Sequence, residues 1–266
     1  MRALVVQLAA VSGLTMALLG CGGGGGGGDP GTATPASATA TPTVRQLTDA
    51  LSSPWGMAFL PDGRMLVTQR RGDLVLLSGS GEPVRSISGP PGVLVQGQGG
   101  LLDVAIDPAF AANRRIYLSF AEADPEQPTL NGTAVARGVL DPEQGTLSEV
   151  TVIYRQLPKV ASSAHFGSRL VFDPAGHLFV TLGDRQSLSE RVHAQDLTRG
   201  NGKVVRITTS GAPAPGNPGW PQAGARPEIW SLGHRNPQGA ALHPGTGELW
   251  VSVDGPQGGE VINRVV

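Results

Sequence analysis

The sequence predicts an all-β protein of the β-propeller type. A hairpin pattern occurs four times along the chain, glycine (39) and proline (22) are frequent among its 266 residues, and no segment keeps a helical period. Frequent glycine and proline indicate many tight turns rather than long helices. A doubly wound α/β fold is therefore not expected.

Each copy of the hairpin has a short apolar strand that ends near a proline, a turn, and a second apolar strand that ends in Ser or Thr. The four copies lie at 57–68, 104–119, 170–181 and 240–252. Further strands are expected between them, at 73–77, 133–137, 150–154 and 203–207. Each unit can then supply about four antiparallel strands, as a propeller blade does.

The fourth copy ends close to Val266, the last residue of the sequence. A propeller stops exposing the edges of its sheets only when its ring closes. We therefore expect about four blades of a larger ring, in a chain that is truncated at its C-terminus.

The N-terminal part has the features of an exported lipoprotein. Residues 1–20 resemble a signal peptide, because Arg2 precedes an apolar stretch that is too short and too mixed for a firm transmembrane helix. The stretch ends in a Leu-Leu-Gly-Cys sequence similar to a bacterial lipobox, in which Cys21 would be acylated. An ordinary secretory signal with an incidental cysteine is the alternative. Cys21 is the only cysteine, so no intramolecular disulfide is possible.

The residues behind Cys21 favour the lipoprotein interpretation. Gly22 to Gly28 is unbroken glycine, and an Ala/Thr/Pro/Ser-rich stretch continues to residue 43. We predict a flexible linker at 21–43, which would hold a propeller domain at 44–266 off a membrane. Since Gly22 rather than Asp follows the cysteine, the outer membrane facing the periplasm is the expected location.

The charge balance argues against nucleic-acid binding. Charged residues make up 15% of the chain and the net charge is −1. No basic field is available to hold nucleic acid or an anionic membrane surface. Membrane contact is thus expected only through the lipid anchor.

Four polar clusters lie directly before or after the repeat strands, at 97–101, 165–170, 233–239 and 254–260. These positions are equivalent through the repeat, so they would converge on one central mouth. There His165 could take a proton near neutral pH, and Arg235 could stabilise charge that develops on an oxygen. The backbone carbonyls of Gly255 and Pro256 could bind a hard cation such as Ca²⁺.

Each cluster also has a structural interpretation when it is taken alone. A histidine before a strand can be a satisfied structural residue, Arg-Asn-Pro can be a capped turn, and the last cluster can be a loop. Gln98 among glycines says little by itself. We treat His177, His193 and His243 as structural or surface residues. The functional interpretation depends on all four clusters occurring together.

At these residues the sequence resembles the glucose/sorbosone dehydrogenase family, in particular its aldose sugar dehydrogenase branch. The resemblance covers roughly Leu47 to Asn263, and the run from Glu228 to Gly239 is its most specific part. Other matching stretches lie at 54–58, 97–104, 165–170, 194–197 with 202–203, and 255–259.

The resemblance implies a six-bladed propeller that holds pyrroloquinoline quinone (PQQ) and Ca²⁺. It implies oxidation of aldose sugars at the anomeric hydroxyl to lactones, with hydride transfer to the quinone and a diffusible electron acceptor. His165 would be the base, and Arg235 and Asn236 would contact the quinone oxygens. Gln98 would line the sugar and cofactor pocket, and the carbonyls of Gly255 and Pro256 would bind the calcium ion.

Some positions depart from the family pattern. Asp254 stands where the family usually has His, and Gln257 where it usually has Arg. Glu260-Val261 replaces the usual Asp-Glu, which removes a carboxylate and puts a second, structural calcium site in doubt. The basic residues that later blades supply to the cofactor's carboxylates are also expected to be missing.

One other function fits parts of the sequence, and a further one does not. A non-catalytic, lipid-anchored propeller that binds a carbohydrate or a protein fits the linker and the altered calcium loop. A calcium-dependent lactonase-type propeller would need Asp, Glu and Asn side chains at the centre of the ring, and the four clusters do not offer that set.

Overall fold

The computed structural model describes residues 43–265. The predicted signal peptide, Cys21 and almost all of the predicted linker lie outside these residues. Residues 43–49 have no regular secondary structure. All of the strands belong to the compact unit that begins at Ala50.

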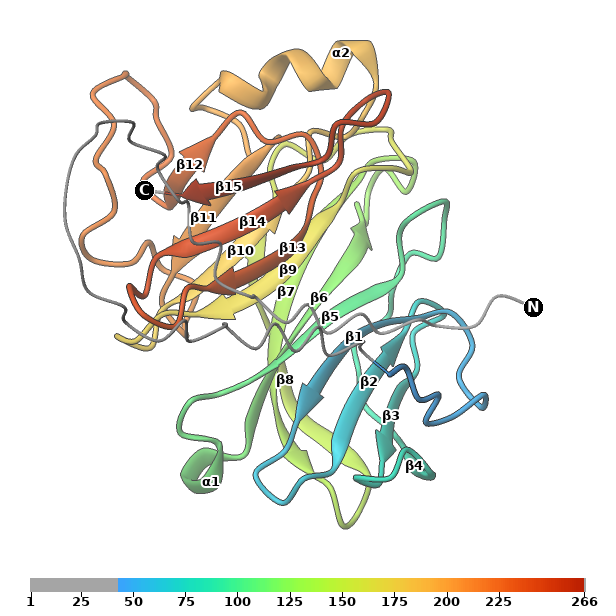
Figure 1. Ribbon diagram of the computed structural model, residues 1–266. Coiled ribbons are helices and arrows are strands. Elements are labelled where there is room, and N and C mark those ends of the chain that lie inside the picture. The colour runs from blue at the N-terminus through green and yellow to red at the C-terminus, as the bar shows by residue number, and fades with distance from the viewer. Residues whose placement is uncertain (1–42, 266) are drawn as a thin grey trace, which may run out of the picture. The chain divides into compact units, whose positions relative to one another are not determined.

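This unit is built from four antiparallel sheets, the blades of a propeller (Figure 1). Blade 1 contains β1 (Pro54–Phe59), β2 (Met65–Gln69), β3 (Leu74–Leu77) and β4 (Pro83–Ile87). Blade 2 contains β5 (Leu101–Ile106), β6 (Arg115–Ala123), β7 (Asn131–Asp141) and β8 (Thr146–Arg155). Blade 3 contains β9 (Gly167–Phe172), β10 (Leu178–Leu182), β11 (Lys203–Ile207) and β12 (Ile229–Leu232). Blade 4 contains β13 (Pro237–Leu242), β14 (Leu249–Val253) and β15 (Val261–Val265). The predicted all-β fold and its four blades are confirmed.

The hairpin turns follow from their sequence. In blade 3 the Asp173 carboxylate accepts the backbone N–H of His177 at 2.8 Å, and Gly176 takes a positive φ of 80° that favours glycine. In blade 1, the Asp62 carboxylate accepts the N–H of Arg64, two residues further on, at 3.0 Å. A short helix, α1 (Phe110–Asn113), replaces the tight turn in blade 2.

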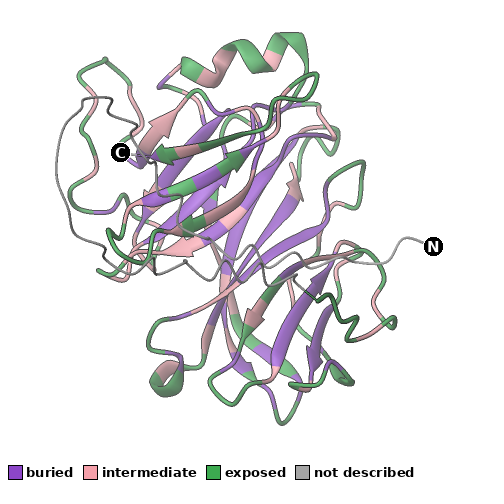
Figure 2. Ribbon diagram, viewed as in Figure 1, coloured by how far each residue is buried: buried purple, intermediate pink, exposed green. Residues whose placement is uncertain are grey.

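The hydrophobic core lies between successive blades. Separate clusters of buried side chains join blades 1 and 2, blades 2 and 3, and blades 3 and 4. Strands β2, β3 and β10 are buried along their whole length, as the purple ribbons in Figure 2 show. Because both faces of these strands are buried, their sequences are nearly continuous apolar runs.

The first strands of the blades, β1, β5, β9 and β13, lie next to one another along the inner side of the blades. They are linked by a hydroxyl side chain at the equivalent position in the second strand of blades 1, 2 and 3. Thr68, Ser119 and Thr181 each accept a backbone N–H from the first strand of their own blade, at 2.8, 2.9 and 2.9 Å. Each donates to a carbonyl of the next blade's first strand, at Leu102, Ser168 and Pro237. We call this repeated bond the inner hydroxyl ladder.

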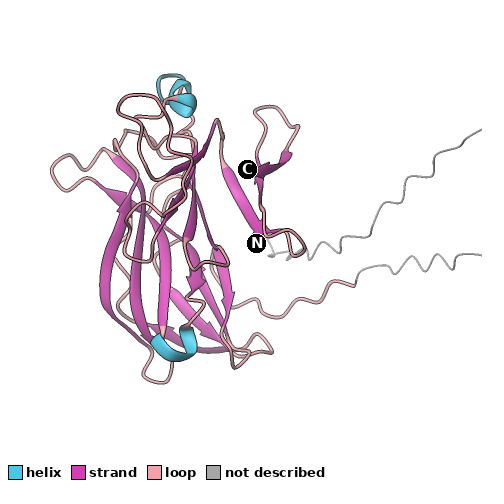
Figure 3. Ribbon diagram, turned by 90° about the vertical axis from the view of Figure 1, so that its left-hand side faces the viewer, coloured by secondary structure: helices cyan, strands magenta, loops and turns pink. Residues whose placement is uncertain are grey.

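The short helices lie at opposite ends of the strands (Figure 3). Helix α2 (Leu188–Arg191) and a 3₁₀ turn (Val192–Gln195) follow β10, whereas α1 connects β5 to β6. The α2 end is also where β9 begins and β10 ends. The polar loops named in the sequence therefore gather at the α2 end.

Candidate functional site

His165 stands in the loop directly before β9, in a conformation that its neighbours fix. Its φ of 49° is unusual for a residue with a side chain. Its backbone N–H donates to the side-chain oxygen Oε1 of Gln98 at 2.8 Å. Gly183 lies so close to the His165 carbonyl that a Cβ there would come within 2.0 Å of it. The loops before β5 and β9 are thus joined at the predicted base.

The His165 imidazole forms a buried pair with Asp184. Its Nδ1 lies 2.7 Å from Asp184 Oδ1, and the two residues are only 3% and 5% exposed. Because an ionised carboxylate only accepts hydrogen bonds, a neutral imidazole in this contact carries its proton on Nδ1 and has its lone pair on Nε2. His165 Nε2 has no hydrogen-bond partner among residues 43–265 and is not sealed from solvent. This arrangement would allow Nε2 to accept a proton.

Arg235 and Asn236 are joined to this pair. The Arg235 carbonyl accepts the backbone N–H of Asp184 at 2.8 Å. Asn236, which is 2% exposed, accepts the N–H of Gly167 at 3.1 Å through Oδ1. The structure thus brings together Gln98, His165, Arg235 and Asn236, which come from three different blades.

The fourth predicted cluster follows β14 and touches the third. Arg235 Nη1 donates to the Asp254 carbonyl at 3.1 Å, and Asn236 Nδ2 donates to Asp254 Oδ2 at 3.0 Å. Gly255 and Pro256 come next, half-buried and exposed. In the described part of the chain, no group of three or more His, Cys, Asp or Glu side chains is arranged to hold a metal ion. Any cation here would depend on backbone carbonyls and Asp254.

A buried lysine supports the loop that carries Arg235 and Asn236. Lys203 Nζ donates to the carbonyls of His193, Ala194 and Asn201 at 3.1, 2.8 and 2.6 Å. Burial lowers the pKa of Lys203 to about 8. The Ala194 carbonyl also accepts the N–H of Gly233, so the lysine holds the turn against which this loop rests.

Sequence reasoning missed Asp184 and its neighbour Arg185. Arg185 is 1% exposed, and its guanidinium carbon lies 3.8 Å from the centre of the Phe166 ring. Its Nη2 donates to Asn131 Oδ1 at 2.6 Å and to the Ser162 carbonyl at 2.5 Å. Burial lowers the pKa of Arg185 to about 10. The side chain thus clamps both sides of the loop that presents His165.

A second ion pair lies between the inner strands. Arg169 Nη1 contacts Asp103 Oδ1 at 2.8 Å, and its Nε donates to the Gln238 carbonyl at 3.0 Å. The guanidinium covers the ring of Trp55 at 4.5 Å. This one side chain of blade 3 therefore contacts blades 1, 2 and 4.

No helix in residues 43–265 is long and apolar enough to cross a membrane. The remaining expectations for the N-terminal segment fall on residues that the structure does not describe.

Comparison with known proteins agrees with the resemblance seen in the sequence. The family model described as Glucose / Sorbosone dehydrogenase matches residues 51–266. The chain is 44% identical over 221 residues to the aldose sugar dehydrogenase YliI of Escherichia coli (strain K12), covering 83% of this chain and 58% of that protein. It thus spans less than two thirds of that relative's length.

Solved structures give the same result. The apo form of the soluble aldose sugar dehydrogenase of Escherichia coli matches with a TM-score of 0.76 and 43% identity, over 82% of this chain and 62% of that one. The PQQ-bound aldose sugar dehydrogenase of Streptomyces coelicolor matches with a TM-score of 0.70 and 30% identity, over 83% and 62%.

Proposed function

We propose that this chain acts in the PQQ-dependent oxidation of aldose sugars at the anomeric hydroxyl to lactones. The chain belongs to the glucose/sorbosone dehydrogenase family, and this membership supports the proposal. The observation that carries this proposal is the buried pair of His165 and Asp184, joined to Arg235 and Asn236. Removal of a hydroxyl proton needs a positioned neutral base, and this pair supplies one.

In this proposal His165 Nε2 takes the proton of the sugar hydroxyl. Asp184 holds the Nδ1–H at 2.7 Å and stabilises the imidazolium that forms. Gln98 uses Oε1 to accept the N–H of His165, which leaves its side-chain NH₂ group for a sugar oxygen. The low exposure of His165 and Asp184 keeps water from competing for their contact.

The residues present fit a quinone cofactor. PQQ would supply a carbon that accepts a hydride from the sugar. Quinone oxygens accept hydrogen bonds, and Arg235 has five N–H donors, of which the Asp254 carbonyl uses one. Arg235 would therefore hold a quinone oxygen and stabilise the negative charge that develops there. Asn236 would act beside it, as an amide already fixed on both sides by Gly167 and Asp254.

A calcium ion is proposed at the Gly255–Pro256 turn. Hard cations prefer oxygen ligands, and the two carbonyls of this turn follow the Asp254 carboxylate. Asn236 occupies one oxygen of that carboxylate, Oδ2, and the other is available. The carboxylate gives this turn a negative charge that a turn of carbonyls alone would lack.

The test is reconstitution of the protein with PQQ and Ca²⁺, with an artificial dye as the diffusible electron acceptor. We expect aldose-dependent dye reduction, and a loss of about a hundredfold or more in His165→Ala with PQQ still bound. Bound PQQ without sugar-dependent reduction would refute the proposal. Binding of a glycan that needs no quinone and survives His165→Ala would instead favour the non-catalytic propeller.

We further propose that the protein is exported and held at the outer membrane, facing the periplasm, by a lipid on Cys21. The lipobox-like sequence and the Gly-rich stretch behind it support this. Metabolic labelling with palmitate should mark the protein in a bacterial host, and Cys21→Ser should abolish the label. Equal labelling of both would contradict the proposal.

A further inference from the structure

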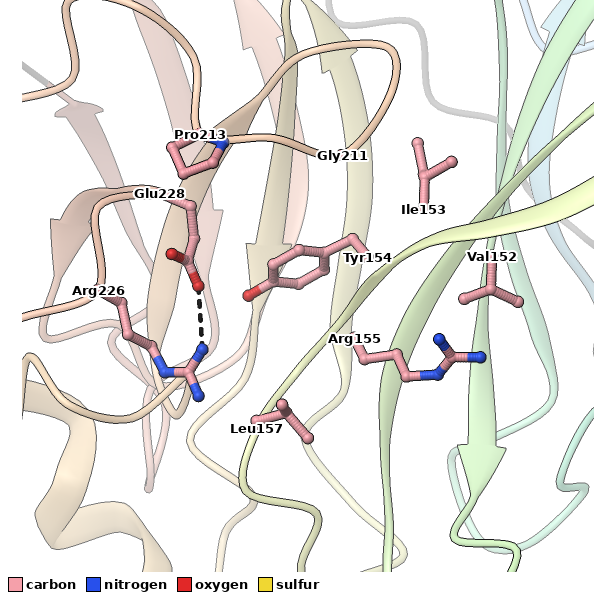
Figure 4. Close-up of a pocket in the computed structure, with 9 residues that line it drawn as sticks. All are labelled: Val152, Ile153, Tyr154, Arg155, Leu157, Gly211, Pro213, Arg226 and Glu228. Carbon is pink, nitrogen blue, oxygen red and sulfur yellow. Dashed lines mark hydrogen bonds and ion pairs between the residues drawn. The ribbon is translucent and has the colours of Figure 1, made fainter.

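A cavity of about 350 Å³ lies between the outer strands of blades 2 and 3 (Figure 4). We call it the rim cavity. Its walls include Val152, Ile153 and Tyr154 of β8, Pro213, and the pair Arg226 and Glu228 just before β12. Strands β8 and β12 are the outermost strands of their sheets, whereas the candidate site is built at the ends of the inner strands. The rim cavity is thus separate from that site.

The Tyr154 hydroxyl is an unsatisfied group in the wall of this cavity. Tyr154 is 8% exposed, and its Oη is buried without a hydrogen-bond partner in the described part of the chain. Burial, with the nearby Glu228 carboxylate, raises the pKa of Tyr154, so the hydroxyl keeps its proton and can both donate and accept. Buried hydroxyls in native proteins normally have a partner, so a group in the cavity is expected to supply one.

Two charged groups face the same space. Arg226 Nη1 lies 3.2 Å from Glu228 Oε1, and Arg226 Nε donates to the Thr198 carbonyl at 3.0 Å. No hydrogen bond within residues 43–265 uses Arg226 Nη2 or Glu228 Oε2. Figure 4 shows the Tyr154 hydroxyl pointing toward this pair. The cavity therefore offers a free cationic donor and a free anionic acceptor, with the Tyr154 hydroxyl in the wall beside them.

These groups restrict the class of ligand. An anion would be repelled by Glu228 and a cation by Arg226, so the balanced pair favours a neutral molecule. A purely apolar molecule would leave all three polar groups unpaired, which is costly. Neighbouring hydroxyls on a ring can accept from an arginine and donate to a carboxylate at the same time, while the C–H face of the ring packs on Ile153 and Pro213.

We propose that the rim cavity binds a neutral cyclic polyol, such as a single sugar ring, as a second and non-catalytic site. Its volume lies at the lower end of the range for small-molecule pockets, which suits one ring. Neither Tyr154 nor the Arg226–Glu228 pair takes part in the proposed oxidation. The inference thus stands independently of the proposed function.

The experiment is a titration of the chain, labelled with ¹³C at its Ile, Leu and Val methyl groups, followed by NMR. The probes are myo-inositol and D-glucose. We expect saturable shifts of the Ile153 and Val152 methyl signals without any added quinone. Tyr154→Phe should weaken binding roughly fivefold, the usual effect of one neutral hydrogen bond. No saturable shift at these methyl groups, or shifts only near the candidate site, would overturn the proposal.

Two comparisons make the test specific. Tyr117→Phe is the matched control, because it removes a buried hydroxyl that bonds to Asp107 at 3.0 Å outside the cavity, and binding should not change. Glu228→Gln should weaken binding of the neutral probes by about tenfold, since it removes a charged acceptor. It should also improve binding of glucuronate relative to glucose. Equal affinity of Tyr154→Phe and the unchanged protein for both probes would show that Tyr154 does not contact the ligand, and the proposal would be wrong.

Discussion

Replacement of Arg169 by Met should expose how strongly the inner strands depend on one ion pair. The Asp103 side chain is 3% exposed and that of Arg169 is 26% exposed. Removing one partner of a buried pair costs about 3–5 kcal/mol, because a charge stays buried without compensation. Since Arg169 is partly exposed, we expect the lower end, a loss of about 3 kcal/mol in the free energy of unfolding at neutral pH.

The pH dependence of this loss has a definite sign. Burial already raises the pKa of the Asp103 carboxyl, and Arg169 opposes the rise. Without the arginine the pKa rises further above its value in the unfolded chain, so the folded state binds the proton more readily. The free energy of unfolding of Arg169→Met should therefore fall as pH rises from about 4, the pKa of an unperturbed Asp, through the raised pKa of Asp103. Its difference in stability from the unchanged protein should shrink toward pH 4.

Urea unfolding followed by tryptophan fluorescence at pH 7.5 and pH 4.5 measures both effects. Asp103→Asn in the Arg169→Met background should recover part of the loss, because an amide oxygen can still accept the N–H of Leu170 that Asp103 holds at 2.8 Å. Arg155→Met is the control, since the Arg155–Glu122 pair is more exposed and worth about 0–1 kcal/mol. An equal deficit at both pH values would refute the reasoning.

Three further predictions concern the site and its support. Asp184→Asn should reduce sugar-dependent dye reduction by about a hundredfold or more with PQQ still bound, and a near-normal rate would contradict its role beside His165. Burial and the nearby Lys203 lower the pKa of His234 to about 4, so the unfolded chain binds more protons between about pH 6.5 and 4. Stability should therefore fall as pH falls through that window, by at most about 3 kcal/mol, and urea unfolding of His234→Gln should show a smaller fall. Ser119→Ala should cost about 1–3 kcal/mol in urea unfolding, because it leaves two buried backbone groups unpaired; a loss no larger than that of an exposed serine would argue against the inner hydroxyl ladder.

Most of the fold could be predicted because buried strands have a strong signal. The strand expected at 203–207 is β11 with the same bounds, and all four hairpins form. The outer strands β4 and β12 and the final strand β15 were not predicted. Strands β4 and β15 are largely exposed, so neither Pro83–Ile87 nor Val261–Val265 has a continuous buried pattern. Strand β12 has only four residues, of which Ile229 alone is fully buried.

The site was predicted in part. Gln98, His165, Arg235 and Asn236 come together as expected, whereas Asp184 was missed because it looked like a loop residue. Finding it requires the register of the hairpin, which the sequence alone did not give. Leu170 pairs with Val180, and a shift in register then brings Gly167 opposite Leu182, so the residues two steps beyond this pair are His165 and Asp184. Antiparallel pairing therefore brings the carboxylate to the base.

The site consists of two parts that the fold positions by different means. His165 and Asp184 belong to one hairpin, so local strand pairing sets their distance. Arg235 and Asn236 belong to the next blade, and their place depends on contacts between blades: Thr181 donates to the Pro237 carbonyl at 2.8 Å, one residue from Asn236. Catalytic side chains must be held within about half an ångström of their productive positions, and loops anchored to rigid inner strands hold them more precisely than free loops do. The repeat that defines the blades thus also aligns the proposed base with the guanidinium, and this explains why the candidate site residues lie immediately beside the ladder.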